Sequence, residues 1–338
     1  MATTSNVTSH SLTTSSPHLV TPDTALLESD EFTAYDILIG SCLTLFFLVG
    51  VPGNALGIKY FLSKRKDVAT SLYLVICTID LCSSLSLVPV ILVLFNGRQP
   101  GMFGERVFCV AWYTTIFYLQ RIAVFSVMLL SVSRTIVIVS PFYKVTKKAV
   151  LLSFIVYSIL LLLHITIPNA VTETEFEYFK PEGMCTNDII SDGVLGAIDE
   201  GLNTMTVAVP AVITFLSFLV STRYLYRARL SHSRNHQASL TMAIFTGAFL
   251  LCNLPFFLNT LIFALTVSLF SPYPGPLYSS NFMFFYSWVL SDLFATVLNA
   301  ALNPVLYYYR MAGFRGWLVG STPQRGPNAR TVSTISMR

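Results

Sequence analysis

The sequence predicts an all-α protein in which seven helices cross a membrane and pack as a bundle. Apolar residues make up 54% of the chain and charged residues only 11%, and the mean hydropathy is +0.65. These values are typical of a protein with many membrane spans and exclude soluble domains. Seven apolar runs also reach the length that a bilayer requires. Lysine and arginine concentrate in alternate connections between the runs, as expected of loops on opposite sides of a membrane.

The seven runs differ in their proline content. Six contain a proline, which removes a backbone hydrogen bond and bends a helix, so we expect six bent helices. The third run has none before Pro141, where it leaves the membrane, and is predicted to be a straight pillar. The runs are Tyr35–Leu62, Thr70–Phe95, Val107–Val139, Ala149–Ala170, Leu202–Val220, Ala238–Phe270 and Asn281–Tyr309, and the six prolines are Pro52, Pro89, Pro168, Pro210, Pro255 and Pro304.

The positions of charged residues predict the orientation. One side of the membrane receives Arg98, Arg106 and Lys180 together with 14 of the 17 acidic residues, whereas the other side receives nearly all the remaining lysines and arginines. Because basic residues concentrate on the cytoplasmic side, we expect the N-terminus outside and the C-terminus in the cytosol of a multi-pass plasma-membrane protein. The predicted parts are an extracellular tail (1–34), a membrane domain (35–310) and a cytoplasmic segment (311–338).

The six cysteines fall into two groups. Only Cys109 and Cys185 lie on the outer, oxidising side, so we predict a disulfide that ties the third helix to the loop 171–201; two free thiols are the alternative. The others lie inside apolar runs and are predicted to be free: Cys42, Cys77, Cys82 and Cys252.

Four polar residues inside the runs predict a buried polar cluster: Asn54, Asp80, Asn299 and Asn303. The last two share one stripe of the seventh helix with Asp292. Because unpaired polar groups in hydrocarbon are costly, we expect these side chains to pair. The cluster suits a structural network that joins three helices, and it also suits a small cation such as Na⁺ at Asp80; both interpretations stay open.

The sequence offers no pattern that is typical of an enzyme. It contains no zinc-ligand spacing, phosphate loop or nucleophile elbow, so we predict a protein without enzymatic activity. Membrane topology explains the basic loops, so nucleic acid is not an expected partner. A seven-span transporter or pump is the alternative, although it should show inverted repeats and more ionisable residues at the midplane than Asp80 and Arg121.

A series of motifs, one in almost every helix, carries a resemblance to a known family. In order they are Gly53-Asn54, Asp80, Cys109 with Cys185, Arg134, Pro210, Cys252-x-x-Pro255 and Asn303-Pro304-Val305-Leu306-Tyr307, followed by Phe314-Arg315. This order resembles the rhodopsin-like family of G-protein-coupled receptors over residues 35–320. The resemblance implies a seven-transmembrane helix bundle with a short amphipathic helix 8 after the seventh span.

The same resemblance implies how such a protein works. An extracellular ligand would bind among the outer halves of the helices and favour a second packing of the bundle. Helices that bend at Pro210, Pro255 and Pro304 would allow the sixth to swing outward and open an inner crevice for a heterotrimeric G protein. Arg134 and Tyr307 would form the switch on that side. Arrestin is a further candidate partner, and membrane lipid surrounds the bundle.

Residue types restrict the ligand but leave its class open. The seventh run has no lysine, which excludes bound retinal, and Ile116 stands where amine receptors carry aspartate. Peptide, lipid and odorant-like ligands all fit these residues. The expectation is therefore an orphan receptor, whose ligand class the sequence does not identify. The candidate pocket residues are Ile116, Arg121 and Asp292; Arg121 could pair with an anionic ligand group or with neighbouring helices.

Two departures from the family pattern concern the switch. Ser133 stands where the family has an acid beside Arg134, and the inner end of the sixth helix, 234–239, has no carboxylate. Asn253 replaces the tryptophan that usually precedes Pro255. Without its usual anchors, Arg134 should be held less firmly, so we predict raised ligand-free signalling that Ser133→Asp lowers. A receptor that no longer couples is the alternative outcome of the same departures.

Overall fold

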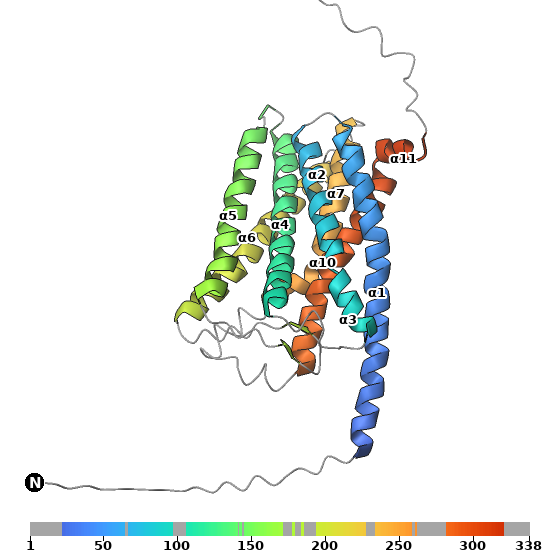
Figure 1. The fold of residues 1–338 in the computed structure, drawn as a ribbon. Helices are drawn as coiled ribbons and strands as arrows, with labels where there is room; N and C mark the ends of the chain where they lie inside the picture. Colours follow the sequence, from blue (N-terminus) through green and yellow to red (C-terminus); the bar gives the residue numbers. More distant parts are fainter. Residues whose placement is uncertain are drawn as a thin grey trace, which may run out of the picture.

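The chain forms a bundle of long helices in a computed structural model (Figure 1). The structure describes residues 22–64, 67–96, 106–140, 142–143, 145–171, 178–179, 184–185, 194–227, 234–258, 261 and 282–320, in part as backbone only. The elements are α1 (Pro22–Leu62), α2 (Val68–Leu85), α3 (Val88–Asn96), α4 (Arg106–Val139), α5 (Lys147–Val171), β1 (Tyr178–Phe179), β2 (Met184–Cys185), α6 (Val194–Arg227), α7 (Arg234–Cys252), α10 (Phe282–Arg310) and α11 (Ala312–Leu318).

Each predicted span has a helical counterpart. Helices α2 and α3 together form the second span, α7 with the helical residues 254–258 belongs to the sixth, and α11 takes the place expected for helix 8. Within the described residues, five segments are long and apolar enough to cross a membrane: Ile37–Leu62, Val68–Leu92, Thr114–Val139, Lys147–His164 and Met205–Arg227. Helix α1 begins at Pro22, so its first turns lie inside the segment predicted as a tail.

Helix α4 occupies the centre of the bundle. It packs against α2, α5, α6 and α7, and it runs for 34 residues without a proline. Figure 1 shows it between α5 on one side and α2 and α7 on the other. The prediction of an uninterrupted third helix is therefore confirmed, with its start within one residue of the apolar run.

The second span breaks before its proline. A turn at Ser86 and Leu87 separates α2 from α3, whereas the sequence places the bend at Pro89. The Ser86 hydroxyl donates to the carbonyl oxygen of Ser83 over 2.7 Å, and the indole N–H of Trp112 on α4 donates to the carbonyl oxygen of Ser86 over 3.0 Å. Side-chain donors thus pair with backbone carbonyl oxygens at the break. The bond from Trp112 holds the break against α4.

The sixth span also breaks earlier than its proline suggests. Helix α7 ends at Cys252, and Asn253 forms a turn before the helix resumes at 254. The backbone N–H and the Nδ2 group of Asn253 both donate to the carbonyl oxygen of Phe249, over 3.0 and 2.9 Å. The bend of the sixth span therefore includes the turn at this buried asparagine as well as Pro255.

Candidate functional site

A buried polar cluster joins α1, α2 and α10. Asn54 donates through Nδ2 to the carbonyl oxygens of Gly50 and Ala300, each over 2.9 Å. Asn303 donates through Nδ2 to Oδ2 of Asp80 over 2.5 Å. Asp80 is only 2% exposed, so its carboxylate lies deep inside the bundle. The two bonded residues are 223 positions apart in the sequence, so this contact links α2 to α10.

The chemistry of this cluster fits water or a hard cation. Asn299 is 4% exposed and lies on the same helix as Asn303, one turn away. Oδ1 of Asn54 and Oγ of Ser83 are buried without a hydrogen-bond partner. Buried acceptors of this kind need a partner, and oxygen ligands beside a carboxylate are those that hard cations prefer. Asp80 is the residue that would provide the negative charge for Na⁺.

Glycines allow the polar cluster to form. A Cβ atom on Gly53 would lie 2.5 Å from Cβ of Pro304, and one on Gly50 would lie 2.6 Å from Oγ of Ser84. Only glycine therefore lets α1 approach α10 and α2 closely enough for Asn54 to reach the α10 backbone. This explains why the Gly53-Asn54 pair occurs at this depth.

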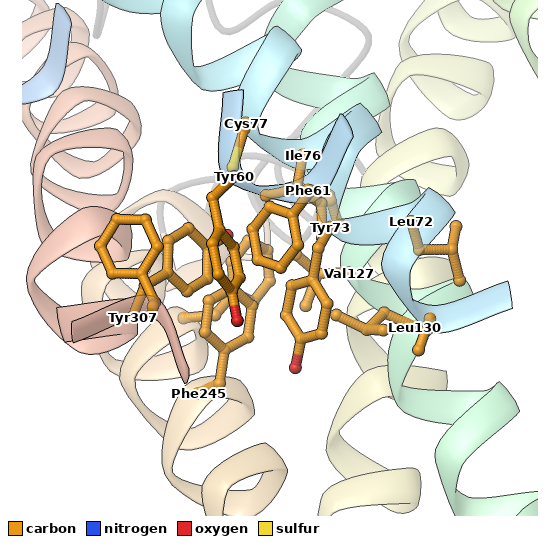
Figure 2. Packing of buried hydrophobic residues seen from close by; sticks show 14 of the residues in the cluster. Tyr60, Phe61, Leu72, Tyr73, Ile76, Cys77, Val127, Leu130, Phe245 and Tyr307 are labelled. Atoms are coloured by element: carbon orange, nitrogen blue, oxygen red, sulfur yellow. The ribbon is translucent and has the colours of Figure 1, made fainter. Parts of the chain in front are cut away.

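An aromatic cluster lies at the end of the bundle where α11 leaves α10 (Figure 2). Its centre is Tyr307, which is completely buried. The Tyr307 ring lies 5.8 Å from the ring of Phe245 on α7 at an interplanar angle of 12°, and it meets Phe61 edge to face at 5.4 Å. Aromatic pairs of this kind stabilise packing beyond the burial of area. Its members are Tyr60, Phe61, Tyr73, Phe245, Tyr307, Phe314 and Trp317.

Arg134 lies at the same end, in a small open pocket between α4, α6 and α7. Nε of this half-buried arginine has no hydrogen-bond partner. The neighbouring Thr135 hydroxyl lies 2.9 Å from that of Ser221 and so joins α4 to α6 beside the pocket. The pocket presents a positive charge and apolar walls to whatever binds from this end. It is lined by Ser131, Arg134, Phe218, Ser221, Ala243 and Thr246.

Ser133, next to Arg134, and Asp67, at the start of α2, both use their side chains in hydrogen bonds within their own helices. Ser133 donates its hydroxyl to the carbonyl oxygen of Leu130 over 2.9 Å, so its side chain is bonded within its own helix. Asp67, at the start of α2, accepts the Thr70 N–H over 2.7 Å and interacts electrostatically with Arg134. Burial alone would raise the pKa of Asp67, but the hydrogen bonds from Thr70 and the charge of Arg134 outweigh it and hold the pKa below its ordinary 3.8.

A comparison with protein families identifies the family of this fold. The model of the 7 transmembrane receptor (rhodopsin family) matches residues 53–307, about three quarters of the chain. The chain belongs to this family. The resemblance and the seven-transmembrane fold class expected from the sequence are thereby confirmed, and the protein is a multi-pass membrane receptor of a class that is generally not enzymatic. A search of curated proteins gave no match.

In this receptor, Arg121 joins α4 to α6 at bilayer depth. Only 3% of the residue is exposed. Its Nε donates to the Thr206 hydroxyl of α6 over 3.3 Å, its Nη1 donates to the carbonyl oxygen of Phe117 over 3.1 Å, and its guanidinium lies 4.7 Å from the Phe117 ring centroid. Tyr157 of α5 donates to the carbonyl oxygen of Thr206 over 2.9 Å. Arg121 therefore has neighbours on adjacent helices, as one of its two interpretations expected.

The remaining candidate residues are Ile116, Asp292 and the two cysteines of the predicted disulfide. Ile116 is half-buried against the cluster of Ile39, Leu43 and their neighbours. The side chains of Asp292, Cys109 and Cys185 lie outside the described residues, so the disulfide stays a prediction; α4 does pack against β2, which contains Cys185. The four cysteines of the spans are free, as predicted.

Sequence reasoning missed two features at the end of the bundle where α11 leaves α10. The aromatic cluster joins rings from α1, α2, α7, α10 and α11, and no local pattern links them. Asp67 did have a signal. It is the only one of the 17 acidic residues outside the outer segments and the spans, and it follows directly on Lys64-Arg65-Lys66.

Proposed function

We propose that this receptor passes the binding of an extracellular ligand on to a heterotrimeric G protein at the plasma membrane. The family supports a receptor of this general type, and the pocket at Arg134 is the observation that carries the proposal. It combines a cation with an unpaired N–H and apolar walls at the basic end of the bundle. A G-protein segment with backbone carbonyls or a carboxylate would complement it. This assignment puts the N-terminus outside and the C-terminus in the cytosol.

The proposed switch is a movement of α7. The pocket is too small to admit a helix, and Phe245 of α7 is stacked on Tyr307. A swing of α7 about Asn253 and Pro255 would separate these rings and widen the pocket beside Arg134. A ligand can drive the swing only if it binds the open arrangement more tightly than the closed one. Bends at Pro210 and Pro304 would let α6 and α10 adjust.

We further infer that the polar cluster around Asp80 couples the two ends. Na⁺ bound there would favour the closed packing, because in this arrangement α2 meets α10 at Asp80 and Asn303, and α1 meets α10 at Asn54. Ile116, Arg121 and Asp292 remain the candidate ligand contacts, and the ligand class stays open. Arrestin would compete with the G protein for the inner face.

The test is G-protein activation in cells. Wild-type receptor, Arg134→Ala and the control Arg223→Ala, in which an exposed arginine of α6 is removed, are expressed at equal surface density with energy-transfer sensors for each G-protein class. We expect ligand-free activation of at least one class, lost in Arg134→Ala and kept in Arg223→Ala. Surface expression without activation of any class, also across a ligand library, would support the non-coupling alternative. Solute uptake into vesicles would support the transporter.

A further inference from the structure

Three exposed cations gather at the end of the bundle where α11 lies beside α1 (Figure 1). Lys64 follows α1, Arg310 ends α10 and Arg315 belongs to α11; together they form what we call the basic corner. After Asp292 the chain has no acidic residue, so α11 supplies no carboxylate to neutralise these charges. The acid nearest to Lys64 in the sequence is Asp67, whose side chain caps α2.

The ring of Tyr60 holds the parts of the basic corner together. Nζ of Lys64 lies 4.6 Å from the centroid of this ring, in a cation–π contact. The rings of Phe314 and Trp317, both on α11, meet the same ring edge to face at 5.1 and 5.7 Å between centroids. Because Tyr60 is only 7% exposed, its position is set by the packing around it. One buried ring therefore fixes both Lys64 and α11.

Exposed apolar side chains border the basic corner. Leu62 is 55% exposed, and Leu318 and Val319, at the end of α11, are 42% and 68% exposed. They lie where the spans end, because Leu62 is the last residue of the membrane-length segment Ile37–Leu62. Apolar side chains flanked by cations are what interfacial helices present to the boundary between headgroups and acyl chains. The half-buried Trp317 suits the same boundary, where tryptophan is enriched.

We propose that the basic corner binds the headgroup of an anionic phospholipid in the cytosolic leaflet. Lys64 and Arg315 contact its phosphate group, while Leu318 and Val319 lie against the acyl chains. Lysine and arginine bind phosphate through charge-assisted hydrogen bonds, and acidic lipids attract basic residues at the membrane surface. The apolar border favours a lipid over an acidic protein segment. The cytosolic side follows from the orientation proposed above, but the inference requires no coupling to a G protein.

Four variants separate the basic corner from the general charge of this end. Lys64→Gln and Arg315→Gln each remove one charge and keep a polar side chain. Lys64→Arg is the conservative variant, because arginine keeps the charge and also stacks on aromatic rings. The matched control is Arg223→Gln, which removes an exposed arginine of α6 two residues after Ser221, beside the Arg134 pocket.

The measurement uses the purified full-length receptor in micelles that contain equal amounts of phosphatidylserine and phosphatidylcholine. Native mass spectrometry counts the lipids that stay bound, and we expect the wild type to retain phosphatidylserine preferentially. Lys64→Gln and Arg315→Gln should each reduce this preference about fivefold, the effect of one basic residue near an anionic lipid surface. Lys64→Arg and Arg223→Gln should match the wild type. An excess of glycerophosphoserine, which is the same headgroup without acyl chains, should not displace the bound lipid.

The other outcomes would overturn the inference. Equal preference in the wild type and both glutamine variants would mean that the basic corner does not bind the lipid. A loss in Arg223→Gln as large as that in Lys64→Gln would mean that the charge of the whole end attracts it. Displacement by glycerophosphoserine would mean that the corner binds a soluble phosphate ester rather than a lipid. A receptor that retains phosphatidylserine as expected but activates no G protein would leave this inference standing while the proposed function fails.

Discussion

The contact between Phe245 and Tyr307 provides the sharpest test of how this receptor stays closed. We predict that Phe245→Leu raises ligand-free activity, because leucine keeps the position apolar and removes the ring. Phe245 is 3% exposed and belongs to the helix that must move. Its ring contacts Tyr307 of α10 and Tyr73 of α2, both at 5.8 Å between ring centroids. Both partners lie on helices other than α7, so a swing of α7 would separate the rings.

The expected size follows from these two ring pairs. An aromatic pair contributes about 0.5–1.5 kcal/mol beyond the burial of area, so two pairs contribute about 1–3 kcal/mol. If the closed arrangement alone has these contacts, the ratio of open to closed receptor rises roughly fivefold to a hundredfold while the open fraction is small. The smaller leucine also leaves unfilled volume, which lowers the melting temperature of the purified receptor.

The assay compares Phe245→Leu with Phe125→Leu at matched surface expression. Phe125 of α4 stacks on Tyr157 of α5 at 3.8 Å and 2°, so the control removes an interhelical ring pair in which α7 takes no part. Both variants should lower the melting temperature, and only Phe245→Leu should raise basal G-protein activation. A lower melting temperature with unchanged basal activity in Phe245→Leu would refute the reasoning, since the cluster would then stabilise both arrangements equally.

Three further predictions concern the bundle above this cluster. Gly53→Ala should lower the melting temperature and surface expression, at a cost of about 1–3 kcal/mol, because its Cβ would overlap a proline ring of α10; normal stability would mean that α1 can shift. Replacing choline with Na⁺ should raise the melting temperature of the wild type but not of Asp80→Asn, and an equal rise in both would exclude a cation site at Asp80. Peptide mapping without reduction should recover Cys109 and Cys185 in one linked pair of peptides; finding both as free thiols would contradict the disulfide.

Much of the fold could be predicted from apolar runs, since the bilayer imposes both length and composition on each span. The start of α4 at Arg106 lies one residue from the expected Val107. The positions of the bends could not be predicted from proline alone. They lie at Ser86 and Asn253, two or three residues before the prolines, where side-chain groups donate to backbone carbonyl oxygens. Which carbonyl receives such a bond depends on the packed neighbours rather than on the local sequence.

The contacts of the polar cluster and of the aromatic cluster differ in how well the sequence predicts them. Asp80 and Asn303 could be expected to meet, because both are polar groups that hydrocarbon would leave unpaired. The partner of Asn54 is a backbone carbonyl of α10, which becomes available only where the glycines of α1 allow close approach. The aromatic cluster could not be predicted, because its rings come from α1, α2, α7, α10 and α11, which no local pattern links.

The two ring contacts of Phe245 are not independent, because its two partners also contact each other. The ring centroids of Tyr73 and Tyr307 lie 5.8 Å apart, and each lies 5.8 Å from the centroid of the Phe245 ring. Perturbations that share a partner couple by about 0.5–3 kcal/mol, whereas distant ones add. We therefore predict that Tyr73→Leu combined with Phe245→Leu raises basal activity by a factor that differs from the product of the single effects. A factor equal to that product, in receptors whose single variants both respond, would mean that Tyr73 and Phe245 restrain α7 separately.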